Sequence, residues 1–124
     1  MVTLLLVGLG GALGSVARHL ISAGIQRSSH SGYPWGTSVV NLSGSFLLGI
    51  VFAVFDSLEF SDALLAFFVA GILGGYTTFS TFSIENMKLL ENRRYGWFLQ
   101  NAIGQIVAGL AAAALGYVLG LAVV

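Results

Sequence analysis

The chain contains no cysteine, a single proline and very little charge. The absence of cysteine excludes disulfides and any metal site built on thiolates. Charged residues make up 8% of the 124 residues, whereas a soluble domain carries roughly 25%. The formal net charge is zero, which argues against a nucleic-acid or other polyanionic partner. With 56% hydrophobic residues and a mean hydropathy of +0.91, the composition is typical of an integral membrane protein.

Four stretches are apolar enough to cross a bilayer, which takes about 20 residues. No Lys or Arg precedes the apolar run that begins at Leu4, so we expect this run to be a span rather than a cleaved signal peptide. The connecting segments leave no room for a soluble domain. We therefore predict an all-α integral membrane protein with a single membrane domain over residues 1–124. The expected spans are about 2–23, 37–55, 63–83 and 98–124.

The third span contains two adjacent glycines followed by five hydroxyl residues within seven positions. The stretch is Gly74-Gly75-Tyr76-Thr77-Thr78-Phe79-Ser80-Thr81-Phe82-Ser83. We expect it to break the helix near mid-membrane. An unpaired backbone group costs several kcal/mol in hydrocarbon, so non-helical backbone survives there only where it lines a cavity or binds something. Two interpretations fit: a binding site, or a kink whose freed carbonyls are capped by the hydroxyls of Thr77 and Thr78.

Polar residues inside the other spans are candidate functional residues, because intramembrane polar groups are costly. Asn41 lies near the start of the second span, and Asn101 and Gln105 share one helix face in the fourth. These amides form either a ladder of hydrogen-bond donors along a narrow path or bonds that hold helices together. Arg18 lies inside the first apolar run. It either attracts an anion into a vestibule or extends its charge to the membrane interface.

Two phenylalanines stand beside the expected break and share one helix face, Phe79 and Phe82. The edges of aromatic rings are electropositive, so such rings tolerate a small anion without burying a full charge. The competing interpretation is that both rings simply pack or face lipid.

Two further absences limit the function. No Asp or Glu lies at the centre of a predicted span, since Glu85 and Glu91 fall at a span end or in a loop. A proton-coupled exporter of cationic drugs needs an intramembrane carboxylate. The sequence also shows no Ser-His-Asp, metal-ligand or phosphate-loop spacing, so we expect no enzyme.

The positive charge lies on one side of the predicted topology. With four spans, both termini and the 56–62 loop share one side, and the 24–35 and 85–96 loops share the other. All five basic residues, counting Arg18, belong to the second side. The positive-inside rule then places both termini outside. Small residues recur every four positions in the fourth span, a pattern that lets helices approach closely and favours an oligomer.

These residues resemble the Fluc (CrcB) family of fluoride channels. The third-span stretch closely resembles the family's signature, and the similarity covers essentially the whole chain. The other matching patches are Gly10-Gly11-Ala12-Leu13-Gly14-Ser15-Val16-Ala17-Arg18, Trp35-Gly36-Thr37 with Val40-Asn41-Leu42, and Gly96-Trp97 through Asn101. The resemblance implies a multi-pass protein of the bacterial inner membrane. It also implies passive, electrogenic and fluoride-specific export that reduces fluoride toxicity.

The resemblance also implies a cofactor and a partner. Members of this family form antiparallel, dual-topology homodimers with two fluoride pores. A structural Na⁺ that is not transported lies at the dimer centre and is held by backbone carbonyls. By motif position, these carbonyls belong to Gly74 and Thr77. The one-sided Lys and Arg distribution leaves a second arrangement open, in which the chain pairs with an oppositely oriented homologous chain.

Carried over by motif position, the fluoride pore is lined by Phe79, Phe82 and Asn41. Arg18 matches the first-span arginine, and we expect it at an anion vestibule. The other expected pore residues are Thr37, Thr81, Ser83, Asn101 and Gln105. Many family members carry a serine where this chain has Gln105. The alternative functions are a small multidrug-type dual-topology transporter, which should carry a buried glutamate in the first span, and a membrane scaffold without transport.

Overall fold

Each of the four apolar runs forms a long helical segment. The computed structural model describes residues 1–124. The first two segments are α1 (Val2–Ser28) and α2 (Trp35–Ser57). The third segment consists of α3 (Asp62–Ala66), the π-helical turn η1 (Phe67–Leu73), α4 (Gly74–Tyr76) and α5 (Phe79–Glu91). The fourth consists of α6 (Tyr95–Leu99), the π-helical turn η2 (Gln100–Gly104) and α7 (Gln105–Val123).

All four segments are long and apolar enough to cross a membrane. This confirms the prediction of an all-α protein with four spans, of which the third is broken. The helices extend beyond the predicted spans, however. The third segment continues to Glu91 instead of ending near Ser83, so Glu85 lies within helix α5 and not in a loop.

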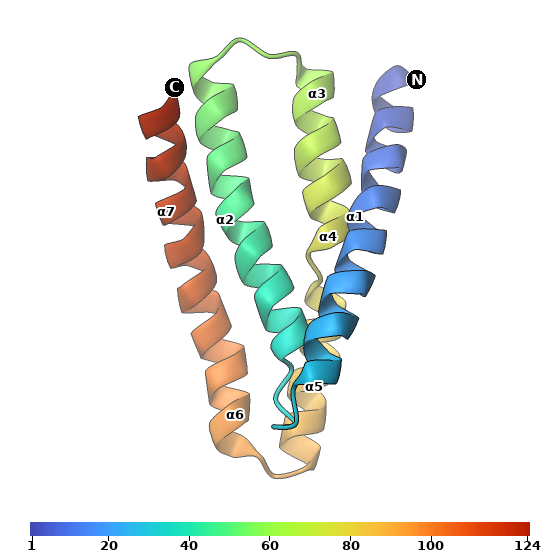
Figure 1. Ribbon diagram of the computed structural model, residues 1–124, viewed down its shortest axis with the longest axis vertical. Coiled ribbons are helices and arrows are strands. Elements are labelled where there is room, and N and C mark those ends of the chain that lie inside the picture. The colour runs from blue at the N-terminus through green and yellow to red at the C-terminus, as the bar shows by residue number, and fades with distance from the viewer.

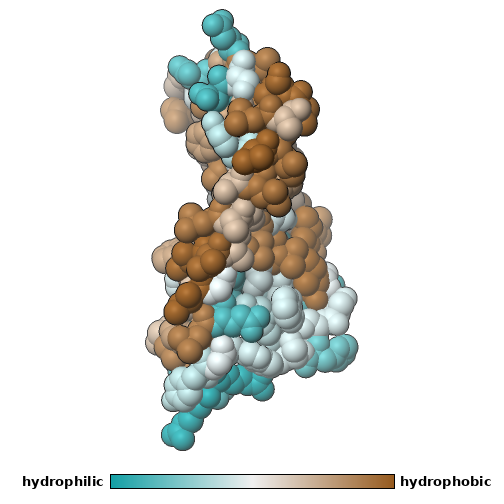
Figure 2. All heavy atoms as spheres, turned by 90° about the vertical axis from the view of Figure 1, so that its left-hand side faces the viewer, coloured by the Kyte–Doolittle hydropathy of each residue, from teal (hydrophilic) through white to brown (hydrophobic).

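The segments run alternately up and down, as Figure 1 shows. Both termini and the α2–α3 connection lie at one end, and the α1–α2 and α5–α6 connections lie at the other. Helix α2 packs along α7, and α1 packs along η1 and α4. Figure 2 shows an apolar band over the middle of the molecule with hydrophilic residues at its two ends. This distribution matches a bilayer with water on both sides.

The buried and exposed residues are distributed in the opposite way to a soluble protein. The exposed side chains include many long apolar residues, such as Leu5 at 67% and Leu110 at 70%. The buried side chains include six polar residues, Thr37, Ser38, Thr78, Asn86, Asn101 and Gln105. In lipid an exposed apolar side chain carries no penalty, whereas polar groups gain by meeting inside the protein.

Glycines bring α2 and α7 into direct contact. A Cβ added to Gly49 of α2 would overlap the carbonyl oxygen of Ala113, and one added to Gly116 of α7 would overlap that of Phe46. Small residues at these points let the two backbones touch, which is how helices associate in lipid. The close contact fixes α7 against α2 and so places the amides of both helices opposite each other.

Candidate functional site

The third segment breaks at Thr77 and Thr78. Both residues have extended backbone, with φ −77° and ψ 159° at Thr77 and φ −148° and ψ 118° at Thr78. Gly74 and Gly75 remain helical. Thr78 starts the next helix, because its hydroxyl accepts a hydrogen bond from the Thr81 N–H at 3.3 Å. The predicted break is therefore present, but the hydroxyl residues form it and the glycines do not.

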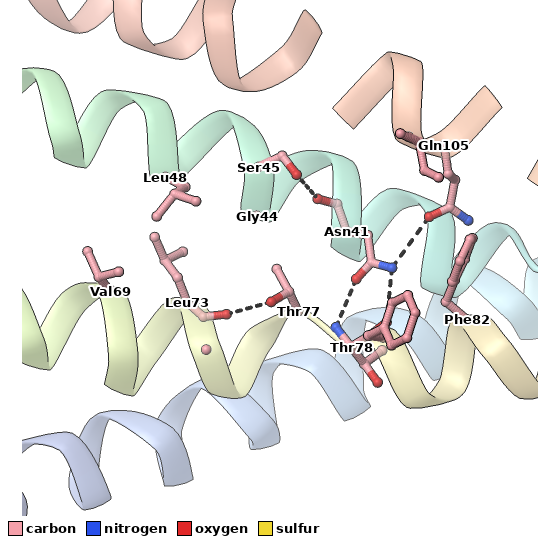
Figure 3. Close-up of a pocket in the computed structure, with 13 residues that line it drawn as sticks. Asn41, Gly44, Ser45, Leu48, Val69, Leu73, Thr77, Thr78, Phe82 and Gln105 are labelled. Carbon is pink, nitrogen blue, oxygen red and sulfur yellow. Dashed lines mark hydrogen bonds between the residues drawn. The ribbon is translucent and has the colours of Figure 1, made fainter. Parts of the chain in front are cut away.

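The side chain of Asn41 replaces the hydrogen bonds that the helix loses at the break. Its Oδ1 accepts from the Thr78 N–H at 2.9 Å, and its Nδ2 donates to the Thr78 carbonyl at 3.1 Å. Figure 3 shows the Asn41 amide lying between Thr78 and Gln105. Because a lone N–H is costly in a membrane, this pairing stabilises the extended conformation.

The carbonyls near the break differ in their partners. The Thr77 hydroxyl donates to the Leu73 carbonyl at 3.0 Å, but this carbonyl already accepts from the Thr77 N–H at 2.9 Å and is not freed by the break. Arg18 of α1 reaches the Thr77 carbonyl, with Nη1 at 3.3 Å from the oxygen, and so points into the protein. No hydrogen bond outside the regular helices ends on the Gly74 carbonyl. The Thr78 hydroxyl bonds Ser80 and Thr81 and no carbonyl, so the two threonine hydroxyls do not cap the carbonyls that the break frees.

A cavity of about 420 Å³ opens beside the break. It contains six of the predicted site residues: Asn41, Gly74, Thr77, Phe79, Phe82 and Gln105. Thr78, Ser45 and several apolar side chains complete the wall, and no charged residue contributes to it. The structure thus gathers residues from three helical segments around one space.

The two phenylalanines lie next to each other in this wall. Their ring centroids are 5.8 Å apart and the ring planes are inclined by 37°. Phe79 is 80% exposed, so it lies at the open side of this cavity. The hydroxyl of Ser83 donates to the Phe79 carbonyl at 2.9 Å, so it is engaged within its own helix.

A second cavity of about 400 Å³ lies on the α1 side of the break. It contains the predicted residues Arg18, Thr37 and Thr81, together with His19. Thr78 lines both cavities, so the extended residue of the break separates them. The sequence analysis did not select Thr78, although its position in the hydroxyl-rich stretch is a usable signal.

The fourth segment contributes a buried set of amides. Asn101 is fully buried and Gln105 is 9% exposed. Gln105 donates from Nε2 to the Asn101 Oδ1 and, at 2.9 Å, to the Ser38 hydroxyl. Asn101 lies outside both cavities, whereas Gln105 lines the first. The prediction that Asn101 and Gln105 share one helix face is confirmed, and their side-chain amides hold neighbouring helices together.

The family-model comparison matches residues 5–117 to "CrcB-like protein, Camphor Resistance (CrcB)". The chain belongs to the CrcB family. It is 44% identical to a fluoride-specific ion channel FluC of Thermus thermophilus, over 97% of this chain and 94% of the relative. It is 45% identical to the FluC of Anaeromyxobacter sp. (strain K), over 93% and 95%. The FluC of Phocaeicola vulgatus is 38% identical, over 94% and 96%.

CrcB membership confirms the family resemblance and a multi-pass membrane protein. The relatives are named as ion channels, which are not enzymes, so the prediction that the chain is not an enzyme is also confirmed. The multidrug-type alternative gains no support, because α1 of this CrcB chain contains no Asp or Glu.

Glu85, which we expected at a span end or in a loop, lies within a helix and outside both cavities. Glu85 lies in α5, and its Oε1 accepts a hydrogen bond from the buried Thr37 hydroxyl at 2.6 Å. Its Oε2 is buried and has no hydrogen-bond partner. The error arose because a carboxylate is a usual mark of a span end, whereas α5 is long enough to carry Glu85 about two turns past the break.

Proposed function

We propose that this chain forms a fluoride-specific channel through which cytoplasmic fluoride leaves the cell passively and electrogenically. The observation that carries this proposal is the first cavity, where Asn41, threonine hydroxyls and two phenylalanine rings meet without any charged side chain. Fluoride is small and strongly hydrated, so its water must be replaced by close donors. Neutral donors and ring edges do this without trapping the ion, and conduction needs such a balance. The names of the relatives support the same substrate.

The two cavities suggest a path for fluoride that extends on both sides of Thr78. Arg18 contributes a positive charge to the second cavity, where it attracts anions from the aqueous side. Thr37 and Thr81 line this cavity with hydroxyl groups. The first cavity then supplies the phenylalanine edges and Asn41. We propose that Asn101 and Ser83 support this path through their hydrogen bonds, together with Gln105, which also lines the first cavity.

We further propose a structural Na⁺ held by the carbonyls of Gly74 and Thr77. The residues present fit such an ion: both line the first cavity, and the Gly74 carbonyl has no partner outside the regular helices. The Thr77 carbonyl accepts one bond from Arg18 and keeps a second lone pair. Hard cations prefer oxygen ligands, and no group of three or more His, Cys, Asp or Glu offers another metal site. A bound Na⁺ would compensate the carbonyl dipoles at the break.

We propose an antiparallel dimer in the bacterial inner membrane as the working form. Phe79 is 80% exposed although it borders the first cavity, and an opposed second copy would cover it. With all five basic residues on one side, an oppositely oriented homologous chain is the alternative partner. Cross-linking of purified single-chain protein in liposomes distinguishes the two, because only the homodimer forms from one chain.

The test of the function is fluoride efflux from liposomes that contain the purified protein, followed with a fluoride electrode. We expect rapid fluoride loss that requires valinomycin to balance charge, without chloride loss under the same conditions. Absence of flux from a protein that is dimeric in detergent would contradict the homodimeric channel. Replacing Na⁺ by a large organic cation on both sides should reduce the flux, and an unchanged flux would contradict the Na⁺ proposal alone.

A further inference from the structure

Five amide groups of this chain are joined head to tail by hydrogen bonds, the nitrogen of each donating to the oxygen of the next. The first is the peptide unit between Thr77 and Thr78, and the last is the side chain of Asn86. The bonds are Thr78 N–H to Asn41 Oδ1 at 2.9 Å, Asn41 Nδ2 to Gln105 Oε1 at 3.4 Å, Gln105 Nε2 to Asn101 Oδ1, and Asn101 Nδ2 to Asn86 Oδ1 at 2.9 Å. We call this series the amide relay.

The backbone sets the direction of the amide relay. The N–H of Thr78 can only donate, so the Asn41 atom facing it is the oxygen, and its nitrogen must face Gln105. At the other side of the same peptide unit, the Thr77 carbonyl accepts from the Arg18 guanidinium at 3.3 Å. The positively charged guanidinium of Arg18 therefore lies at the carbonyl of the first amide in the relay. Each amide polarises the next, which strengthens consecutive bonds by roughly 10–30%.

Gln105 is the link that joins the break to the fourth segment. Its Nε2 is anchored by two acceptors, Asn101 Oδ1 and the Ser38 hydroxyl. Its Oε1 lies toward Asn41 at the wall of the first cavity, as Figure 3 shows. Because the nitrogen is held on two sides and the side chain is buried, the amide of Gln105 cannot rotate freely. Its oxygen is a fixed acceptor for Asn41.

We propose that Gln105 is a positioning residue that holds the Asn41 amide through the amide relay. In this arrangement both ends of the Asn41 amide are held: its oxygen accepts from the Thr78 N–H, and its nitrogen donates to the Thr78 carbonyl and to Gln105. A shorter hydroxyl residue at this position has no atom that reaches Asn41 and Asn101 together. This inference rests on the proposed fluoride channel, since its functional readout is fluoride flux.

The variant Gln105→Met tests the proposal, because methionine has a similar length but neither accepts nor donates an amide hydrogen bond. The variant leaves Asn41 Nδ2 with the Thr78 carbonyl, and it leaves Asn101 Oδ1 with the Tyr33 and Ser38 hydroxyls. No buried amide loses all its partners, so we expect the fold to persist. Gln100→Met is the matched control: it makes the same substitution in the same helical segment, at an exposed side chain that lines neither cavity.

We expect Gln105→Met to slow fluoride flux about fivefold, as the loss of one positioning hydrogen bond implies. Gln105→Ser should slow it similarly, and Gln100→Met should not. A retained flux in Gln105→Ser would show that any polar group at this wall suffices and would overturn the positioning role. Wild-type protein without fluoride flux would instead overturn the proposed function.

A spectroscopic measurement separates positioning from a general loss of structure. The chain contains four asparagines, of which Asn92 is exposed, lies outside the amide relay and donates to the Lys88 carbonyl. In asparagine-labelled protein, Gln105→Met should shift the side-chain NH₂ signals of Asn41 and Asn101 and leave that of Asn92 unchanged. Equal shifts at all asparagines, or no shift at Asn41, would overturn the proposal whatever the flux.

Discussion

The replacement Asn41→Leu tests whether one side chain holds the broken helix. Leucine has a side chain of similar length to asparagine but no polar atoms. It removes the acceptor of the Thr78 N–H at 2.9 Å and the donor to the Thr78 carbonyl at 3.1 Å. Thr78 is 9% exposed, so water does not readily replace the lost partner. The extended conformation of the break then has an unpaired N–H inside the membrane.

The expected loss of stability follows from that single N–H. A buried donor left without a partner costs about 1–3 kcal/mol. The cost is toward the upper end here, because the group lies in a segment that crosses hydrocarbon. The weaker contact of Asn41 Nδ2 with Gln105, at 3.4 Å, adds little. We therefore expect Asn41→Leu to lower the free energy of unfolding by about 2–3 kcal/mol.

The assay is reversible unfolding in mixed micelles with a denaturing detergent, followed by circular dichroism. Ser45→Ala is the control, since it removes a hydroxyl from the same cavity without touching Thr78. The control should change the free energy of unfolding by less than about 0.5 kcal/mol. If Asn41→Leu also changes the free energy of unfolding by less than this amount, the break does not depend on the Asn41 amide and the reasoning is wrong.

Three other predictions follow from the structure. Replacing Phe79 and Phe82 together by Ile should abolish fluoride flux in liposomes while the helical fold is kept, because the ring edges are lost and an apolar side chain remains; retained flux would contradict the proposed pore. Thr37→Val should lower the free energy of unfolding by about 1.5–3 kcal/mol, because it removes the only hydrogen bond to the Glu85 carboxylate. Thr37→Ser keeps the hydroxyl and should behave as wild type in the same detergent titration. Gly116→Ala should cost about 1–3 kcal/mol in that assay, because the added Cβ forces α2 and α7 apart; wild-type stability would show that the contact is not close.

Local sequence patterns predicted the elements of this site more reliably than their contacts. Hydropathy located the four segments, and the hydroxyl-rich stretch located the break. The spacing of Asn101 and Gln105 correctly placed both amides on one face, where they bond each other. Span ends were less accurate, since α5 continues past Ser83 and contains Glu85. Hydropathy averages over a window, so it does not show where a helix ends when a polar residue finds a partner inside the protein.

The partners of the break had no signal in the sequence. Asn41 and Thr78 lie 37 residues apart, and Arg18 and the Thr77 carbonyl lie 59 residues apart. The sequence identified Asn41 and Arg18 as candidates because a polar group in a span is costly. It left open whether each would contact a ligand, the membrane interface or another helix. In the structure both side chains form hydrogen bonds with the residues of the break. Thr78 lies between two cavities, and no pattern in the sequence predicted them.

The sequence by itself determined the membrane class, the four segments, the broken third segment and the family, because these follow from composition, periodicity and a specific motif read along the chain. Only the tertiary structure decided which amide faces which. That outcome depends on how closely the helices approach, and glycine contacts such as Gly49 against Ala113 set this distance for α2 and α7. Hydrogen bonds act over about 3 Å and within a narrow angle, so small differences in helix packing decide whether Gln105 reaches Asn41.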